Sequence, residues 1–323
     1  MNGGGAVTDF DHVVVLAGGL SPERDVSLRS GRRVRDALEE SGVDARIADA
    51  DAALIPALLA DPPTAVFPTI HGSYGEDGAI REILALVGVP YVGSAASACR
   101  AAFDKPTAKA LVGAAGIATP ESVTLPREIF HDLGATAVID RIIARLGLPL
   151  FVRPARGGSS LGASPVRTAS ELPTAVVSCF AYGDTALIER FISGTEIAIS
   201  VVDLGDGPSA LPAVEIVPTA GQYDYAARYT AGRTAFYTPA RLPDAALDAA
   251  AKAAASAHAA LGLRDISRTD LIVSESGEVY FLEVNVSPGM TETSTLPMAL
   301  DAAGHDFGTA CLTLLRLAAA RGS

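Results

Sequence analysis

Three oxygen-bearing side chains lie in or next to two apolar segments near the C-terminal end of the chain. Asp270 is in the segment 270–273, Glu283 is in the segment 279–284, and Asn285 directly follows that segment. The two segments predict an antiparallel hairpin, and because residues two apart in a strand share a face, the three side chains converge. Oxygen-only ligands suit Mg²⁺. The alternative, solvated strand carboxylates, is disfavoured because unpaired carboxylates are costly in apolar strands.

A glycine-rich loop provides a second chemical signal. Residues 153–162 read Arg153-Pro-Ala-Arg-Gly-Gly-Ser-Ser-Leu-Gly162 and follow a predicted strand at 149–153. Such a loop lets backbone N–H groups approach phosphate oxygens. Many glycine-rich loops are plain turns, so this signal alone leaves both interpretations open.

The N-terminal third shows the elements of a parallel sheet. A strand is expected at 12–17, a glycine turn after it, and a helix over 26–40; a second unit follows at 64–70, 78–87 and 90–92. Strands that alternate with helices predict an α/β fold with a doubly wound parallel sheet. We assign residues 1–104 to this domain.

The order of predicted helices and strands changes from about residue 104. Helices are expected at 105–115 and 135–146, and strands at 149–153, 186–192 and 195–204. These elements predict an α+β domain over residues 105–191.

The last third, residues 192–323, is expected to form a third domain that carries the hairpin. Strands are predicted at 211–217 and 269–273, and between them residues 218–240 read as a long polar loop. Long structureless loops in compact domains are often lids over active sites.

Composition excludes several classes of protein. The net charge of −12 over 323 residues argues against a nucleic-acid surface, which needs clustered basic residues. Cys99, Cys179 and Cys311 are far apart and lack metal-site spacing, so we expect buried free thiols. No signal peptide and no apolar stretch of about 18 residues is evident, which predicts a soluble cytoplasmic protein without a membrane segment.

Six ordered motifs resemble the D-alanine–D-alanine ligase family of the ATP-grasp superfamily, essentially from end to end. They are Gly18-Gly-Leu-Ser-Pro-Glu-Arg-Asp-Val-Ser-Leu28, His71-Gly-Ser-Tyr-Gly-Glu-Asp-Gly78, Phe103-Asp-Lys105, Gly157-Gly-Ser-Ser-Leu-Gly162, Tyr223-Asp-Tyr-Ala-Ala-Arg-Tyr229 and Glu283-Val-Asn-Val-Ser-Pro-Gly-Met290. A Rossmann dehydrogenase is disfavoured, since Gly18-Gly19 does not continue as GxGxxG. The resemblance implies a three-domain ATP-grasp architecture.

The resemblance also implies an ATP site between the central and C-terminal domains. Lys105 and Arg153 would surround the phosphates, Glu189 and Glu196 would lie near adenine and ribose, and Arg228 is a further phosphate contact. The family usually has lysine at the positions of Arg153 and Arg228, and arginine offers a planar fork instead of a point charge. Two Mg²⁺ or Mn²⁺ ions would bind Asp270, Glu283 and Asn285.

The implied reaction forms an acyl phosphate from one D-alanine and then joins a second D-alanine to it. Glu23 would hold the ammonium of the first substrate, and Ser294 the carboxylate of the second. Arg268 and the N–H of Gly289 would hold the tetrahedral oxyanion. Without the resemblance, Glu23 reads as an acid at a helix start, which the helix dipole favours.

The predicted lid would be fastened by Ser159 and Tyr229, which form a hydrogen-bonded link with Glu23 in such ligases. A closed lid protects an acyl phosphate from water. His71 is expected nearby, either as a site group or as a satisfied structural histidine.

The sequence leaves the identity of the second amino acid substrate open. Thr295 follows Ser294 where the family commonly has leucine or methionine, so D-serine or another amino acid is an alternative to D-alanine. An ATP-binding regulator without ligase activity is disfavoured, because Glu23, Ser159, Arg268 and the metal set are all retained. The resemblance also implies a role in peptidoglycan precursor synthesis. Relatives in the family are usually dimers, so we expect a homodimer.

Overall fold

The computed structural model describes residues 10, 12–158, 160–219 and 232–322. Its N-terminal sheet has three parallel strands in the order β2-β1-β3, namely β1 (Val13–Ala17), β2 (Ala45–Asp49) and β3 (Ala65–Pro68). All five residues of β1 are buried, as expected for a parallel strand covered on both faces. A parallel bridge from Val66 to Tyr91 extends the sheet by one position, so the predicted strand at 90–92 is a single bridge.

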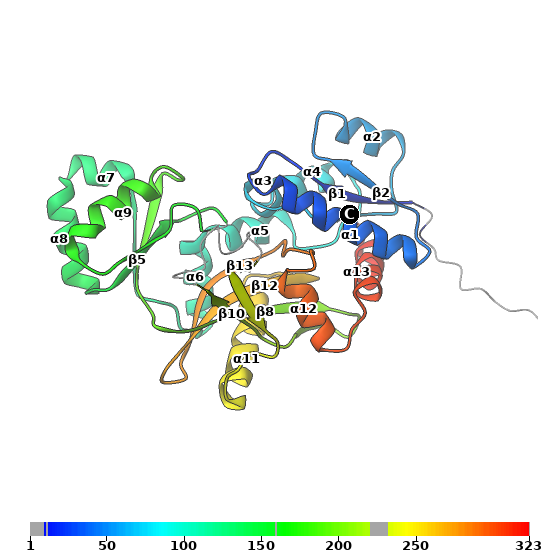
Figure 1. Ribbon diagram of the computed structural model, residues 1–323. Helices are drawn as coiled ribbons and strands as arrows, with labels where there is room; N and C mark the ends of the chain where they lie inside the picture. The colour runs from blue at the N-terminus through cyan, green and yellow to red at the C-terminus, as the bar shows by residue number, and fades with distance from the viewer. Residues whose placement is uncertain (1–9, 11, 159, 220–231, 323) are drawn as a thin grey trace, which may run out of the picture.

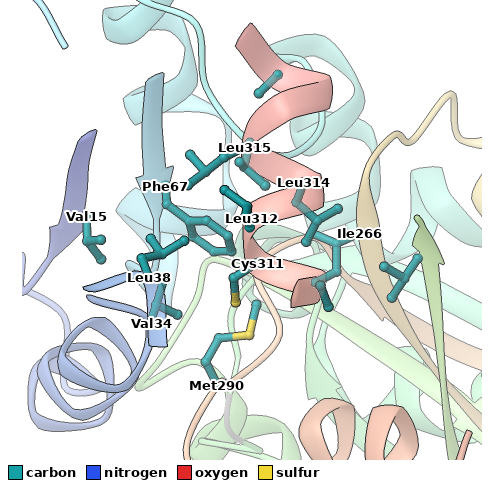
Figure 2. Packing of buried hydrophobic residues seen from close by; sticks show 14 of the residues in the cluster. Val15, Val34, Leu38, Phe67, Ile266, Met290, Cys311, Leu312, Leu314 and Leu315 are labelled. Atoms are coloured by element: carbon teal, nitrogen blue, oxygen red, sulfur yellow. The ribbon is translucent and has the colours of Figure 1, made fainter. Parts of the chain in front are cut away.

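Helices cover this sheet and connect it to the chain's other end. They are α1 (Arg24–Glu40), α2 (Leu54–Ala60), α3 (Ser73–Glu76), α4 (Ala79–Val87) and α5 (Ala96–Phe103). The C-terminal helix α13 (Phe307–Arg321) packs against α1 and β3. Figure 2 shows this junction, where Phe67 and Leu38 meet Leu312 and Leu315. The two ends of the chain therefore share one hydrophobic core.

The central region forms a separate lobe, drawn in green at the left of Figure 1. Its antiparallel sheet has the order β4-β7-β5-β6, with β4 (Ser122–Pro126), β5 (Leu150–Pro154), β6 (Ser164–Val166) and β7 (Thr185–Arg190). Its helices are α7 (Arg127–Asp132), α8 (Ala135–Leu146), the 3₁₀ turn η1 (Ala169–Glu171) and α9 (Leu172–Cys179). A hydrophobic cluster that includes Ile142, Leu150 and Ile188 holds the lobe together.

The third sheet is built around the long strand β8. Its order is β11-β10-β8-β12-β13, with β9 also paired to β8. The strands are β8 (Gly194–Asp203), β9 (Pro208–Ala210), β10 (Val214–Pro218), β11 (Thr234–Tyr237), β12 (Ile266–Ser274) and β13 (Val279–Asn285). The alanine-rich α11 (Asp244–Ala260) and α6 (Lys105–Ala114) pack on it, and α12 (Thr295–Ala302) lies against β8. Small alanine side chains allow this close helix-to-sheet packing.

Most of the predicted elements are confirmed, and a second prediction, after the strand at 90–92, is corrected. The polar loop expected over residues 218–240 is not structureless throughout: Thr234–Tyr237 forms β11, which pairs antiparallel with β10. Residues 220–231 lie outside the described part of the chain. All three cysteines are buried and free, as predicted. No helix among the described residues is long and apolar enough to cross a membrane.

Candidate active site

The predicted hairpin is confirmed and places its polar side chains on one face. β12 and β13 pair antiparallel with Asp270 opposite Glu283 and Arg268 opposite Asn285, and a register shift follows Asp270. Residues directly opposite one another in such a pair have neighbouring side chains. The sequence alternation therefore assembles two carboxylates, one amide and one guanidinium within a single patch.

Arg268 forms the strongest contact within this patch. Its Nε lies 2.7 Å from Asp270 Oδ1 and its Nη2 lies 2.9 Å from Oδ2, a two-pronged ion pair. Asp270 is only 2% exposed, so the guanidinium compensates a carboxylate that water hardly reaches.

The larger of two adjoining cavities has a volume of about 460 Å³ and lies between the central lobe and the third sheet. Lys105, Arg153, Glu189 and Glu196 all line it, as do Asp270, Glu283 and the glycine loop. Lys105 Nζ lies 2.6 Å from the carbonyl oxygen of Gly157 and 3.3 Å from Glu283 Oε2. The structure thus brings together all four predicted nucleotide residues that it describes.

A buried ion network forms one wall of this cavity. Arg153 Nε donates to Glu189 Oε2 at 2.6 Å, and its Nη2 donates to the carbonyl oxygen of Leu282 at 2.9 Å. Lys109 binds Glu189 Oε1 from behind the wall and donates to the Pro120 carbonyl oxygen at 2.9 Å. Burial lowers the pKa of the Lys109 ammonium, and the charge of Glu189 opposes that shift.

The smaller cavity, of about 310 Å³, lies where the N-terminal domain meets the third sheet. Its lining includes the predicted residues Glu23, Arg268, Asn285, Gly289 and Ser294. Glu23 is 5% exposed and sits at the N-cap position of α1. The structure therefore gathers these predicted residues around one cavity.

Two glycines allow the backbone to come close to Glu23. Gly72 has φ +77°, and a Cβ there would lie 2.5 Å from Glu23 Oε2, so a larger residue cannot fit without displacement. A Cβ on Gly158 would lie 3.4 Å from Glu23 Oε1 and 4.0 Å from Glu76 Oε2. The glycine loop of the central lobe thus reaches both acids of the N-terminal domain.

Glu76 lies at the end of α3 beside Glu23. Its Oε1 accepts hydrogen bonds from Gly72 N at 3.0 Å and from Asn285 Nδ2 at 3.3 Å. Burial raises the pKa of the Glu76 carboxyl to about 7, the Gly72 N–H opposes the shift, and the negative charge of Glu23 adds to it. The cavity therefore holds an acid that titrates near neutral pH.

His71 links the N-terminal domain to the loop that follows β13. Its Nδ1 lies 2.9 Å from the carbonyl oxygen of Ser287 and its Nε2 lies 3.1 Å from Ser30 Oγ. A carbonyl oxygen only accepts, so Nδ1 carries the proton and Nε2 accepts from Ser30. Burial lowers the pKa of the imidazole to about 4. His71 lines the smaller cavity and is also a satisfied neutral histidine, which reconciles the two interpretations of the sequence.

The start of α12 closes the smaller cavity. Ser294 Oγ accepts from Thr291 N at 3.1 Å, and a Cβ on Gly289 would lie 2.5 Å from that oxygen, so glycine is needed there. Thr295 is 8% exposed and lines the same cavity. Within the described part of the chain its hydroxyl has no hydrogen-bond partner, which leaves it available to a substrate.

The two cavities share four residues, namely Lys105, Gly157, Gly158 and Glu283. An ammonium group, a glycine turn and a carboxylate thus stand where the contents of the two cavities would meet. Three predicted site residues, Ser159, Arg228 and Tyr229, lie outside the described residues.

The donor atoms of Asp270, Glu283 and Asn285 fit a hard divalent cation. All are oxygens, two of them carboxylates, which Mg²⁺ and Mn²⁺ prefer. Asn285 Oδ1 accepts from Ser287 N at 2.7 Å and keeps a second lone pair. Among the described residues no group of three or more His, Cys, Asp and Glu side chains has metal-binding geometry, so the amide is needed to complete a three-residue set.

Comparison with known proteins agrees with this arrangement. The family profile described as "D-ala D-ala ligase C-terminus" matches residues 111–316, and "D-ala D-ala ligase N-terminus" matches residues 44–94. The chain belongs to the D-alanine–D-alanine ligase family. It is 41% identical to a D-alanine–D-alanine ligase from Nitrosospira multiformis over 310 residues, 96% of this chain and 97% of that protein.

Solved structures of the family have the same ATP-grasp fold. The chain resembles the VanG D-Ala:D-Ser ligase from Enterococcus faecalis with a TM-score of 0.82 and 29% identity, covering 96% of this chain and 99% of the other. It also resembles the ATP complex of the D-alanine–D-alanine ligase from Bacillus anthracis, with a TM-score of 0.77, 27% identity and 96% of each chain covered. The predicted fold class is thereby confirmed.

Sequence reasoning assigned no role to two residues of this ligase-family site. Glu76 lies within the motif His71–Gly78, but its burial beside Glu23 depends on a contact with Asn285, which lies 209 positions away in the sequence. Lys109 stands four residues after Lys105 on α6, and only the fold shows that it contacts Glu189 from outside the cavity. The spacing of the two lysines on one helix was the available signal.

Proposed function

We propose that the chain joins two D-alanine molecules in an ATP-dependent reaction that yields D-alanyl-D-alanine, ADP and phosphate for peptidoglycan precursor synthesis. The observation that carries this proposal is the junction of the two cavities at Lys105, Gly157, Gly158 and Glu283. A nucleotide in the larger cavity would present its terminal phosphate to an amino acid in the smaller one. Membership of the family supports the same activity.

In the first step a carboxylate oxygen of one D-alanine attacks the γ-phosphorus of ATP, and the bond to the leaving ADP oxygen breaks. Glu23 binds the substrate ammonium, and its burial supports this role, because a buried carboxylate gains from a positive partner. Lys105 and Arg153 balance the phosphate charge. The product is an acyl phosphate.

In the second step the amine of another D-alanine attacks the acyl carbon. The tetrahedral intermediate then expels phosphate, and the amine loses its proton as the peptide bond forms. Arg268 and the N–H of Gly289 hold the developing oxyanion, and Ser294 holds the acceptor carboxylate. Their common place in the smaller cavity supports these roles.

Asp270, Glu283 and Asn285 would hold divalent cations, which supply positive charge to the transferring phosphoryl group. The all-oxygen donor set on adjacent strands supports this assignment.

We also propose three functional domains over residues 1–104, 105–191 and 192–323. We further propose a lid within residues 218–240 that Ser159 and Tyr229 fasten through a link with Glu23, a phosphate contact for Arg228, and a homodimer. Light scattering coupled to gel filtration tests the dimer by its mass.

The proposed reaction is tested by mass spectrometry of products formed from D-alanine and ATP. D-Alanine labelled with ¹⁸O in its carboxylate should deliver one labelled oxygen to phosphate, since the acyl C–O bond breaks in the second step. Dipeptide without label in phosphate would contradict the acyl phosphate, and absence of dipeptide would contradict the ligase.

D-Serine is a second candidate acceptor because of Thr295. Thr295 is 8% exposed and lines the smaller cavity beside Ser294, and one structural relative is a D-Ala:D-Ser ligase. Competition between D-alanine and D-serine in the same assay measures the preference.

A further inference from the structure

Three cations neutralise the two carboxylates of the candidate metal site. Arg268 binds both oxygens of Asp270, while Lys105 Nζ and Arg153 Nη1 lie 3.3 Å and 3.4 Å from Glu283 Oε2. A divalent cation would need the same carboxylate oxygens. Guanidinium or ammonium groups and a metal ion therefore compete for one set of ligands.

Arg153 is the best anchored of the cations that contact Glu283. Its Nε is held by Glu189 and its Nη2 by the Leu282 carbonyl oxygen, which directs Nη1 at Glu283. Lys109 fixes Glu189 from the other side. A lysine at position 153 has one terminal nitrogen and cannot satisfy three acceptors on three sides.

We propose that Arg153 couples nucleotide binding to metal binding: its guanidinium holds Glu283 against a divalent cation until nucleotide phosphates draw it away. The inference rests on the proposed function, because it takes ATP and the metal site from there. Nucleotide phosphates compete with Glu283 for the guanidinium of Arg153, and the metal ion competes with that guanidinium for the carboxylate of Glu283. Binding of either ligand therefore favours binding of the other, and by thermodynamic reciprocity the two effects are equal.

The experiment measures binding of Mn²⁺ to the full chain by the electron paramagnetic resonance signal of free Mn²⁺, with and without ADP. Mn²⁺ alone should bind the natural protein weakly, and saturating ADP should tighten binding by roughly tenfold or more. Arg153→Met should tighten binding of Mn²⁺ alone by about fivefold and reduce the effect of ADP, and Arg153→Lys should fall between. No turnover enters this measurement.

Arg156→Met is the matched control. Arg156 lines the same cavity but pairs with Asp104 at 2.8 Å, away from Glu283. Its loss should leave binding of Mn²⁺ alone unchanged, and Glu283→Gln combined with Arg153→Met should abolish the gain. Circular dichroism melting confirms that each variant is folded.

Two outcomes overturn the inference while the proposed function stands: Arg153→Met binds Mn²⁺ alone no tighter than the natural protein, or Arg156→Met gains as much as Arg153→Met. Failure of Mn²⁺ to bind even with ADP has a different meaning. It removes the metal site of the proposed function and this inference with it.

Discussion

The two adjoining cavities arrange their buried carboxylates differently. In the larger cavity Glu189 is held between Lys109 and Arg153, and Glu283 lies beside Lys105 and Arg153. In the smaller cavity Glu23 and Glu76 approach the same glycine, and the nearby buried histidine is neutral. The larger cavity therefore pairs Glu189 and Glu283 with cations, whereas the smaller cavity brings two carboxylates close to each other.

This difference fits the charges of the two ligands. A nucleotide triphosphate brings negative charge, which cations already in place can receive. An amino acid brings an ammonium group, which the neighbouring carboxylates of Glu23 and Glu76 would attract. The two cavities also differ in construction. Strands β5, β7 and β13 and helix α6 carry the ion network, whereas the smaller cavity combines residues of the N-terminal domain with residues of β11, β12, β13 and the loop that follows β13.

The largest expected effect comes from the two carboxylates of the proposed metal site, Glu283 and Asp270. Glu283→Gln or Asp270→Asn should lower kcat by about 10³-fold or more, since the phosphate charge loses its metal compensation. Steady-state ADP release measures this. Asp248→Asn, an exposed acid on α11, is the control. Full activity in excess chelator would show that no metal is needed.

The ion network that forms one wall of the larger cavity should contribute strongly to the free energy of unfolding of the protein. Lys109→Met leaves a buried carboxylate with one partner fewer, which should lower the free energy of unfolding by about 3–5 kcal/mol. Urea denaturation measures the loss, and Lys252→Met, on the exposed face of α11, is the control. Adding Glu189→Gln should recover part of it. Equal stability of the two lysine variants would mean that the buried network contributes nothing measurable.

In the smaller cavity, ionisation of a buried carboxylate should make the free energy of unfolding depend on pH. Burial raises the pKa of Glu76 to about 7, so the folded state binds this proton more tightly than the unfolded state does. The stabilisation is complete below the unfolded pKa of about 4.3, and it is lost as the pH rises through the folded pKa. By pH 8 the charged carboxylate costs about 3 kcal/mol.

Glu76→Gln removes this titration. The difference in unfolding free energy between variant and natural protein should therefore move in favour of the variant by about 3 kcal/mol between pH 4.5 and pH 8. His71 titrates with the opposite sign, but it is common to both proteins and cancels in the difference. Glu82→Gln, on α4, is the control. A difference that does not vary with pH would show that Glu76 is not perturbed.

The elements around the two cavities also differ in how well the sequence predicts them. The hairpin of β12 and β13 was predictable because alternating polar residues in apolar strands fix both the pairing and the shared face. The strand β2, with the sequence ARIAD, gave little signal because its residues are only partly buried and partly polar. β11 was hidden in a polar segment, since an edge strand needs no continuous apolar pattern.

The charges of the smaller cavity could not be predicted for a different reason. The pKa values of Glu76 and His71 depend on burial by segments more than 200 residues away, such as Asn285 and Ser287. Local propensity does not report such contacts. The residues proposed to bind the metal were easier to predict from the sequence than these pKa values, because the motifs themselves contain the oxygen donors.

The smallest expected effect concerns Thr295, at the acceptor side of the smaller cavity. Its hydroxyl stands at the first position of α12, where no preceding helical carbonyl can accept from it, so a hydroxyl of D-serine is a suitable partner. Thr295→Val keeps the shape and removes only the hydroxyl. The ratio of kcat/KM for D-serine over D-alanine should fall by about fivefold, as expected for one hydrogen bond worth about 1 kcal/mol. Thr295→Leu adds bulk and should lower the ratio at least as far. If Thr295→Val leaves the ratio unchanged while Thr295→Leu lowers it, Thr295 acts by volume alone. The smaller cavity then selects the acceptor's side chain by its size and not by a hydrogen bond.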